Sequence, residues 1–154
     1  MDYQSFISSK HTAVSQSGFE PRRLSDSLFE YQRHCVEFAL RAGRSAMFLD
    51  TGLGKTFCQL EYAREVVEHT NQPVLVLTPL AVAAQTARES DKFGIDAKVI
   101  RDDGDVFNGV NIINYDRLDR LDVSQFSGVI LDESSILKNF SGKTRNQLVN
   151  AFRN

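Results

Sequence analysis

Apolar positions recur along the chain with two alternating patterns. In residues 28–39 they return every three or four positions, which predicts an amphipathic helix, and Gly43 provides a stop signal. Similar spacing predicts helices from Lys55 to about 71–73, at 81–92 before Gly94, and at 141–152. Short apolar runs lie between these segments and predict strands at 45–49, 74–78, 97–100, 110–114 and 129–131.

This alternation of strands and helices predicts an α/β fold, a three-layer domain with a mainly parallel sheet. The unbroken apolar run at 74–78 is typical of a strand that is covered on both faces. Residues 1–27 are polar and read as an N-terminal arm or loop, so we expect the domain to occupy 28–154. In such folds ligands bind at the carboxyl ends of strands, which draws attention to the residues after 45–49 and after 129–131.

A glycine-rich segment follows the first predicted strand and leads into the helix that begins at Lys55. Gly52 and Gly54 would let backbone N–H groups turn inward, Lys55 would reach the β- and γ-phosphates, and the Thr56 hydroxyl would bind Mg²⁺. The strict phosphate-loop pattern has a glycine where Leu49 stands. A second Gly-Lys-Thr, at 142–144, has no nearby glycine and no preceding strand, so we interpret it as a helix start with Ser141 as N-cap.

Two carboxylates end the last predicted strand. We expect Asp132 to hold Mg²⁺, usually through water, and Glu133 to orient and deprotonate the attacking water. Together with the phosphate loop, this pair predicts a site for ATP and Mg²⁺.

Composition and charge bear on the size of the domain, its partners and its location. The 154 residues carry 18 basic and 20 acidic side chains, which fits one globular domain without global polybasic character. The segment after Glu133 is basic, either as a nucleic-acid contact or as a solvated helix face. Cys35 and Cys58 fall in helical patterns and read as buried thiols. No signal peptide or membrane-spanning run is visible, so we expect no membrane partner and a cytoplasmic protein of a bacterium or phage-infected host.

The same residues form a series of spaced motifs. Tyr31-Gln32 resembles a Q motif, and residues 50–56 resemble motif I of superfamily 2 helicases and translocases. Residues 77–80, with Gln85, resemble motif Ia, and Asn114-Tyr115 falls where a later strand-end motif occurs. Residues 131–135 and then 137–139 resemble motif II, with Ser134 and Ser135 departing from the usual residues. The chain thus resembles the first RecA-like motor domain of the Swi/Snf-like branch and its phage and prophage DEAD/DEAH-type relatives.

The resemblance implies a P-loop NTPase that serves as the ATP-binding part of a nucleic-acid motor, a helicase or DNA translocase. Lys55, Asp132 and Glu133 would be catalytic, Thr56 and Asp132 would bind the metal, and Gln32 would contact the adenine edge. The residues expected to bind the nucleotide are Gln32, Thr51, Gly52, Leu53, Gly54, Lys55 and Thr56. The residues expected to contact nucleic acid, DNA in preference to RNA, are Thr78, Pro79, Leu80, Asn114 and Tyr115.

The family also implies parts beyond residue 154. A strand carrying the next motif would lie between the phosphate-loop strand and the motif II strand, and a second RecA-like lobe would supply an arginine finger. We therefore expect an incomplete motor domain, truncated after motif II, that alone binds nucleotide poorly and hydrolyses it negligibly. Two alternatives remain: the motor subunit of a restriction or packaging machine, and a non-enzymatic remnant that serves as an interaction module.

Overall fold

A computed structural model describes residues 16–50, 52–135 and 142–152. Its sheet has four strands, all parallel, in the order β2-β3-β1-β4. The strands are β1 Val74–Thr78, β2 Ala97–Val99, β3 Val110–Asn114 and β4 Gly128–Leu131. The predicted α/β fold with a parallel sheet is confirmed, and the strands at 74–78 and 110–114 have the predicted bounds.

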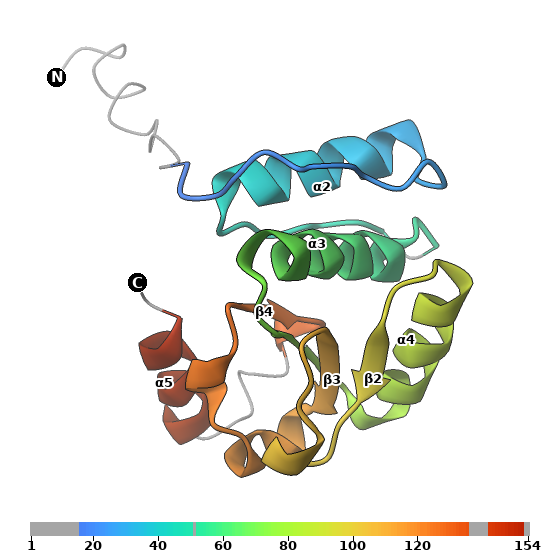
Figure 1. The fold of residues 1–154 in the computed structure, drawn as a ribbon. Helices are drawn as coiled ribbons and strands as arrows, with labels where there is room; N and C mark the ends of the chain where they lie inside the picture. The colour runs from blue at the N-terminus through green and yellow to red at the C-terminus, as the bar shows by residue number, and fades with distance from the viewer. Residues whose placement is uncertain (1–15, 51, 136–141, 153–154) are drawn as a thin grey trace, which may run out of the picture.

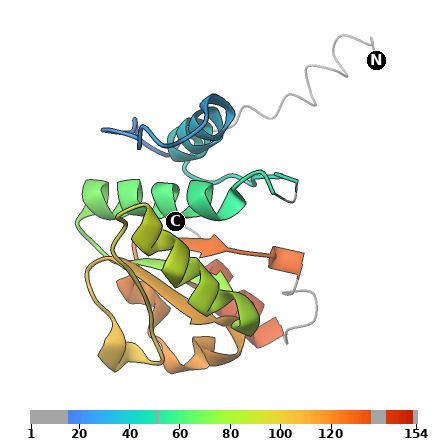
Figure 2. The ribbon, with the colours of Figure 1, turned by 90° about the vertical axis from the view of Figure 1, so that its right-hand side faces the viewer.

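Among the described residues, α-helices and short 3₁₀ helices flank the sheet. They are α2 Glu30–Ala42, α3 Lys55–Thr70, α4 Leu80–Lys92, α5 Gly142–Ala151, η1 Asp103–Asp105, η2 Tyr115–Arg120 and η3 Val123–Gln125. Helix α3 lies between α2 and the sheet, while α5 lies on the opposite side of the sheet (Figures 1 and 2). The predicted stop at Gly43 is confirmed by its left-handed backbone, with φ of 74°.

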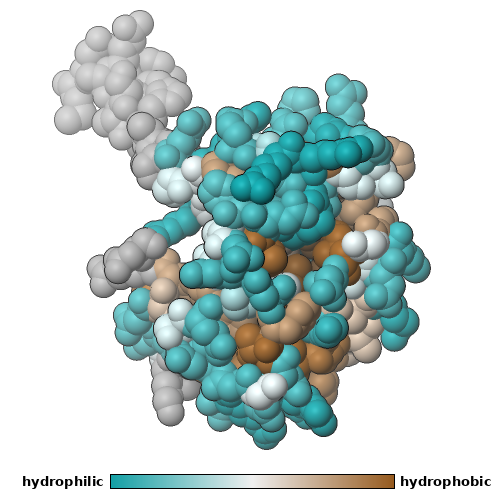
Figure 3. Space-filling model, viewed as in Figure 1, coloured by the Kyte–Doolittle hydropathy of each residue, from teal (hydrophilic) through white to brown (hydrophobic). Residues whose placement is uncertain are grey.

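The central strand β1 divides the core in two because successive side chains point to opposite faces. Val74 and Val76 pack with α3 and its neighbours, whereas Leu75 and Leu77 pack with the 3₁₀ helices and α5. All five β1 residues are buried, as expected of a strand covered on both faces. Figure 3 shows apolar residues in the middle of one molecular face, framed by polar side chains. No helix among the described residues is long and apolar enough to cross a bilayer.

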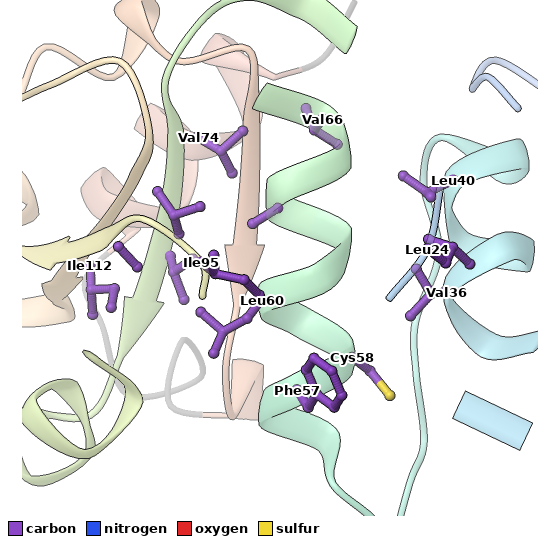
Figure 4. Packing of buried hydrophobic residues seen from close by; sticks show 14 of the residues in the cluster. Leu24, Val36, Leu40, Phe57, Cys58, Leu60, Val66, Val74, Ile95 and Ile112 are labelled. Atoms are coloured by element: carbon purple, nitrogen blue, oxygen red, sulfur yellow. The ribbon is translucent and has the colours of Figure 1, made fainter. Parts of the chain in front are cut away.

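Helix α2 packs on the outer face of α3. Leu24, Val36 and Leu40 face Cys58 across this contact (Figure 4). The segment before α2 has no regular structure from residue 16, yet it lies against both helices: the Phe19 N–H donates to Leu40 O at 2.9 Å, and its ring stacks on His69 at 3.8 Å. Part of the expected arm therefore belongs to the packed body.

Two buried carboxylates on α3 hold this segment in place. Glu61 accepts the Ser25 N–H at 2.6 Å, and Glu65 accepts the Arg22 N–H at 2.8 Å. Both also accept hydrogen bonds from the Arg64 guanidinium, at 2.8 and 2.7 Å. The hydrogen bonds that Arg64 donates to Glu61 contribute most to raising the pKa of Arg64 above its usual range. This cluster fixes the segment that leads into α2.

The prediction of a strand at 45–49 is wrong. These residues adopt no regular secondary structure, and the Phe48 side chain is 95% exposed, while Met47 and Leu49 pack partly against the core. A strand forms only where its backbone N–H and C=O groups find a ladder partner. Among the described residues, β4 is the last strand on its side of the sheet, and 45–49 pairs with no strand.

Candidate nucleotide-binding site

The phosphate loop lies directly before α3. Gly52 and Gly54 have φ values of 82° and 71°, left-handed conformations that glycine adopts without strain. Gly54 is the N-cap of α3 and provides no capping side chain, so the first N–H groups of the helix are left for a ligand. The space where a Cβ of Gly52 would stand is open to 4 Å. These features fit a phosphate group, because helix N-termini with uncapped N–H groups bind anions.

Two residues of α2 hold the tip of this loop. The Tyr31 hydroxyl and the Gln32 amide each donate to the Leu53 carbonyl at 3.0 Å. The Gln32 Oε1 accepts the Phe29 N–H at 3.0 Å, and the side chain is buried. A side chain at Gly54 would collide with the Gln32 amide. In this structure both polar ends of Gln32 thus serve the protein, and the contact with adenine stays a prediction.

The side chains of Lys55 and Asp132 lie close together although the two residues are far apart in the sequence. Lys55 begins α3, and its Nζ lies 3.9 Å from Asp132 Oδ1. Asp132 follows β4 and is 8% exposed, and its Oδ1 also accepts a hydrogen bond from Gln59 Nε2 at 3.1 Å. Thr56 is half-buried in the first turn of α3. The two strand-end regions singled out in the sequence therefore form one site, with the cation of Lys55 beside the carboxylate of Asp132.

Glu133 is exposed beside Asp132 and has a φ of 52°, a left-handed conformation that is uncommon outside glycine. The neighbouring main chain is held by Tyr115, whose hydroxyl donates to the Asp132 carbonyl at 2.7 Å. Burial, followed by the charges of Asp132 and Glu133, raises the pKa of Tyr115 above its usual range. The phenol therefore keeps its proton and remains a hydrogen-bond donor.

The residues expected to contact nucleic acid differ in how accessible they are. Leu80, in the first turn of α4, is 68% exposed, and Pro79 is its half-buried N-cap residue. The side chains of Thr78, Asn114 and Tyr115 are buried. Among these five, Leu80 and Pro79 offer side-chain surface to a partner in this conformation.

Some predicted positions lie outside the described residues: Thr51, the end of motif II at 137–139, and Ser141. Within the described part of the chain, no three His, Cys, Asp or Glu side chains converge as a metal site. The assignment of Thr56 and Asp132 as metal ligands stays a prediction; two protein ligands would suit Mg²⁺, because this ion keeps several waters when it binds.

Known proteins resemble this chain in sequence. No family model matches the chain. It is 32% identical over 131 residues, 76% of its length, to the SWI/SNF-related matrix-associated actin-dependent regulator of chromatin subfamily A-like protein 1 of Xenopus laevis. The Xenopus tropicalis protein of that name is 30% identical over the same length. The chain is a homologue of SWI/SNF-related proteins. It spans 13% of the length of each of these relatives.

A solved structure, that of the UvsW helicase from bacteriophage T4, has the same fold. It matches with a TM-score of 0.68 over 98% of this chain and 56% of the helicase, at 18% identity. This likeness supports the RecA-like domain fold. The resemblance to superfamily 2 helicases of the Swi/Snf-like branch, predicted from the motifs, is confirmed.

The sequence motifs pointed to Lys55, Thr56, Asp132 and Glu133 but not to Gln59. Gln59 lies one helical turn after Lys55, on the same face of α3. This i, i+4 spacing from Lys55 is the available signal, since a buried polar side chain on that face of the helix needs a partner.

Proposed function

We propose that this chain is the ATP-binding part of a nucleic-acid motor, a helicase or translocase that works on DNA rather than RNA. The observation that carries the proposal is the approach of Lys55 to Asp132, which brings a phosphate-loop lysine beside a strand-end carboxylate. ATP would sit on the N-terminus of α3, with Lys55 on its β- and γ-phosphates. Mg²⁺ would lie between Thr56 and Asp132, and Glu133 would activate water.

The rest of the motor function requires a second lobe. Glu133 is exposed, so water reaches it from the open side of the site. A second RecA-like lobe closing on that side would exclude bulk water and provide the arginine finger, and ATP binding and hydrolysis would then drive closure and opening. Nucleic acid would lie across the carboxyl ends of β1 and β3, with Pro79 and Leu80 at its backbone.

Two substitutions test this proposal. Lys55→Ala should abolish ATP-dependent activity and leave DNA binding near normal, because Lys55 faces the phosphates. Glu133→Gln should keep ATP binding and stop turnover, because an amide cannot accept the proton of water. Steady-state hydrolysis and filter binding of labelled DNA measure the two properties separately. Turnover of Glu133→Gln at the unaltered rate would rule out the assigned base.

A further inference from the structure

Asp132 is held by its neighbours at both its main chain and its side chain. Its N–H donates to Leu77 O at 2.9 Å, and its carbonyl accepts the Tyr115 hydroxyl at 2.7 Å. Its Oδ1 accepts the Gln59 amide at 3.1 Å and lies 3.9 Å from Lys55 Nζ. The contacts come from three elements, β1, η2 and α3, so Asp132 is fixed relative to the central strand, to the segment that follows β3 and to the phosphate-loop helix.

Gln59 is suited to orient a carboxylate that must bind a cation. Its side chain is buried, and a buried amide without a partner would cost about 1–3 kcal/mol, so the hydrogen bond to Asp132 is strongly favoured. An amide donates without carrying charge. It therefore fixes the direction of the carboxylate and leaves its negative charge for the metal, whereas a lysine or arginine in its place would compete with that metal.

Tyr115 complements this contact from the other side of the sheet. Its hydroxyl holds the carbonyl of Asp132, next to the left-handed backbone of Glu133. Asn114, the residue before it, ends β3 beside the end of β1. Together with the hydrogen bond from the Asp132 N–H to Leu77 O, this contact fixes the main chain where β4 ends and the two carboxylates follow.

We propose that Gln59 and Tyr115 are positioning residues for the metal-binding carboxylate: Gln59 orients the Asp132 side chain and Tyr115 its main chain. The proposal rests on the proposed ATP and Mg²⁺ site. It predicts that both residues contribute to metal-dependent nucleotide binding without touching the nucleotide. Residues that orient metal ligands in this way commonly change metal affinity by about 10- to 100-fold when they are replaced.

The test measures ADP binding by calorimetry, once with Mg²⁺ and once with EDTA, and takes the ratio of the two dissociation constants. Gln59→Leu removes the amide and Tyr115→Phe removes only the hydroxyl. Each has a matched control elsewhere in the fold. Gln125→Leu removes an amide that bonds to Asp103, and Tyr62→Phe removes a hydroxyl that bonds to the Gly43 carbonyl.

We expect Gln59→Leu to lower the Mg²⁺ enhancement of ADP binding by about 10-fold, the lower end of that range. Tyr115→Phe should lower it by roughly 5-fold, the worth of about 1 kcal/mol for one hydrogen bond. ADP binding in EDTA should stay unchanged, and both controls should behave as the unaltered protein does. A merely structural role would weaken binding equally with and without metal.

Two other outcomes separate the possible failures. If the unaltered protein binds no ADP, the proposed nucleotide site is contradicted, and if it binds ADP equally well in Mg²⁺ and in EDTA, the proposed Mg²⁺ site is contradicted. If it shows the enhancement and Gln59→Leu and Tyr115→Phe retain it in full, the positioning role is overturned. Gln59→Met keeps the length of the side chain, and it replaces the leucine variant if that variant is unfolded at the assay temperature.

Discussion

The buried carboxylate Glu61 offers a demanding test of how the segment before α2 is held. The side chain is 0% exposed, accepts the Ser25 N–H, and forms a two-point contact with Arg64 at 2.8 and 3.1 Å. Glu61→Ala would leave the partly buried Ser25 N–H without this partner and would remove the buried carboxylate from the half-buried Arg64 guanidinium. Removing one partner of a buried ion pair typically costs about 3–5 kcal/mol. Because Arg64 is partly exposed and keeps Glu65, we expect the lower end, about 3 kcal/mol.

Glu68→Ala is the matched control because Glu68 pairs with the same arginine from the same helix. Its side chain is 46% exposed, and such surface pairs contribute about 0.3–0.5 kcal/mol. Urea unfolding followed by circular dichroism gives the free energy of unfolding, and thermal unfolding should show a Tm lowered by about 6–12 °C for Glu61→Ala. If the two variants lost equal stability, the reasoning that burial governs this cluster would be refuted.

Three further outcomes follow from the structure. Gly54→Ala should lower both the free energy of unfolding and the nucleotide affinity, because residue 54 is left-handed and a Cβ there would collide with the Gln32 amide. Gly142→Ala is the control, since a Cβ there meets nothing within 4 Å. Equal losses of stability and affinity in the two variants would contradict this prediction. Thr78→Val should keep or raise Tm, because the buried hydroxyl has no hydrogen-bond partner among the described residues. A large decrease in Tm would contradict this prediction. Burial raises the pKa of Cys58 to about 11 from an ordinary value of 9.0, so the unfolded thiol loses its proton first. The free energy of unfolding should therefore fall as pH rises from 9 to 11, and chemical unfolding should show a smaller fall in Cys58→Ala.

The sequence predicted much of this fold because its signals are local. The apolar run of β1 and the glycine after α2 each determine their own element, and both lie where the pattern places them. The segment at 45–49 has the same apolar character but is not a strand, because a strand depends on a partner that no local pattern reveals. The 3₁₀ helices between β3 and β4 are short and carry no clear periodicity.

In the candidate site, too, some features follow from the sequence and others depend on tertiary packing. Lys55 and Asp132 were predicted from motifs, and their approach follows from the shared carboxyl edge of a parallel sheet. The Gln59 contact depends on how far α3 is rotated against β4, which is a matter of tertiary packing. The Tyr31 and Gln32 contacts to Leu53 depend in turn on where α2 lies against the loop, and the buried carboxylates Glu61 and Glu65 fix the segment that precedes α2.

The central claim is that the Gly-Lys-Thr at 54–56, and not the one at 142–144, binds the phosphates of a nucleotide. Calorimetric titration of ADP with Mg²⁺ into Lys55→Ala and Lys143→Ala compares the two directly. We expect Lys55→Ala to weaken binding by about 10- to 100-fold, the worth of a charged hydrogen bond, and Lys143→Ala to bind as the unaltered protein does. Unchanged binding by Lys55→Ala, or an equal loss in both variants, would contradict it.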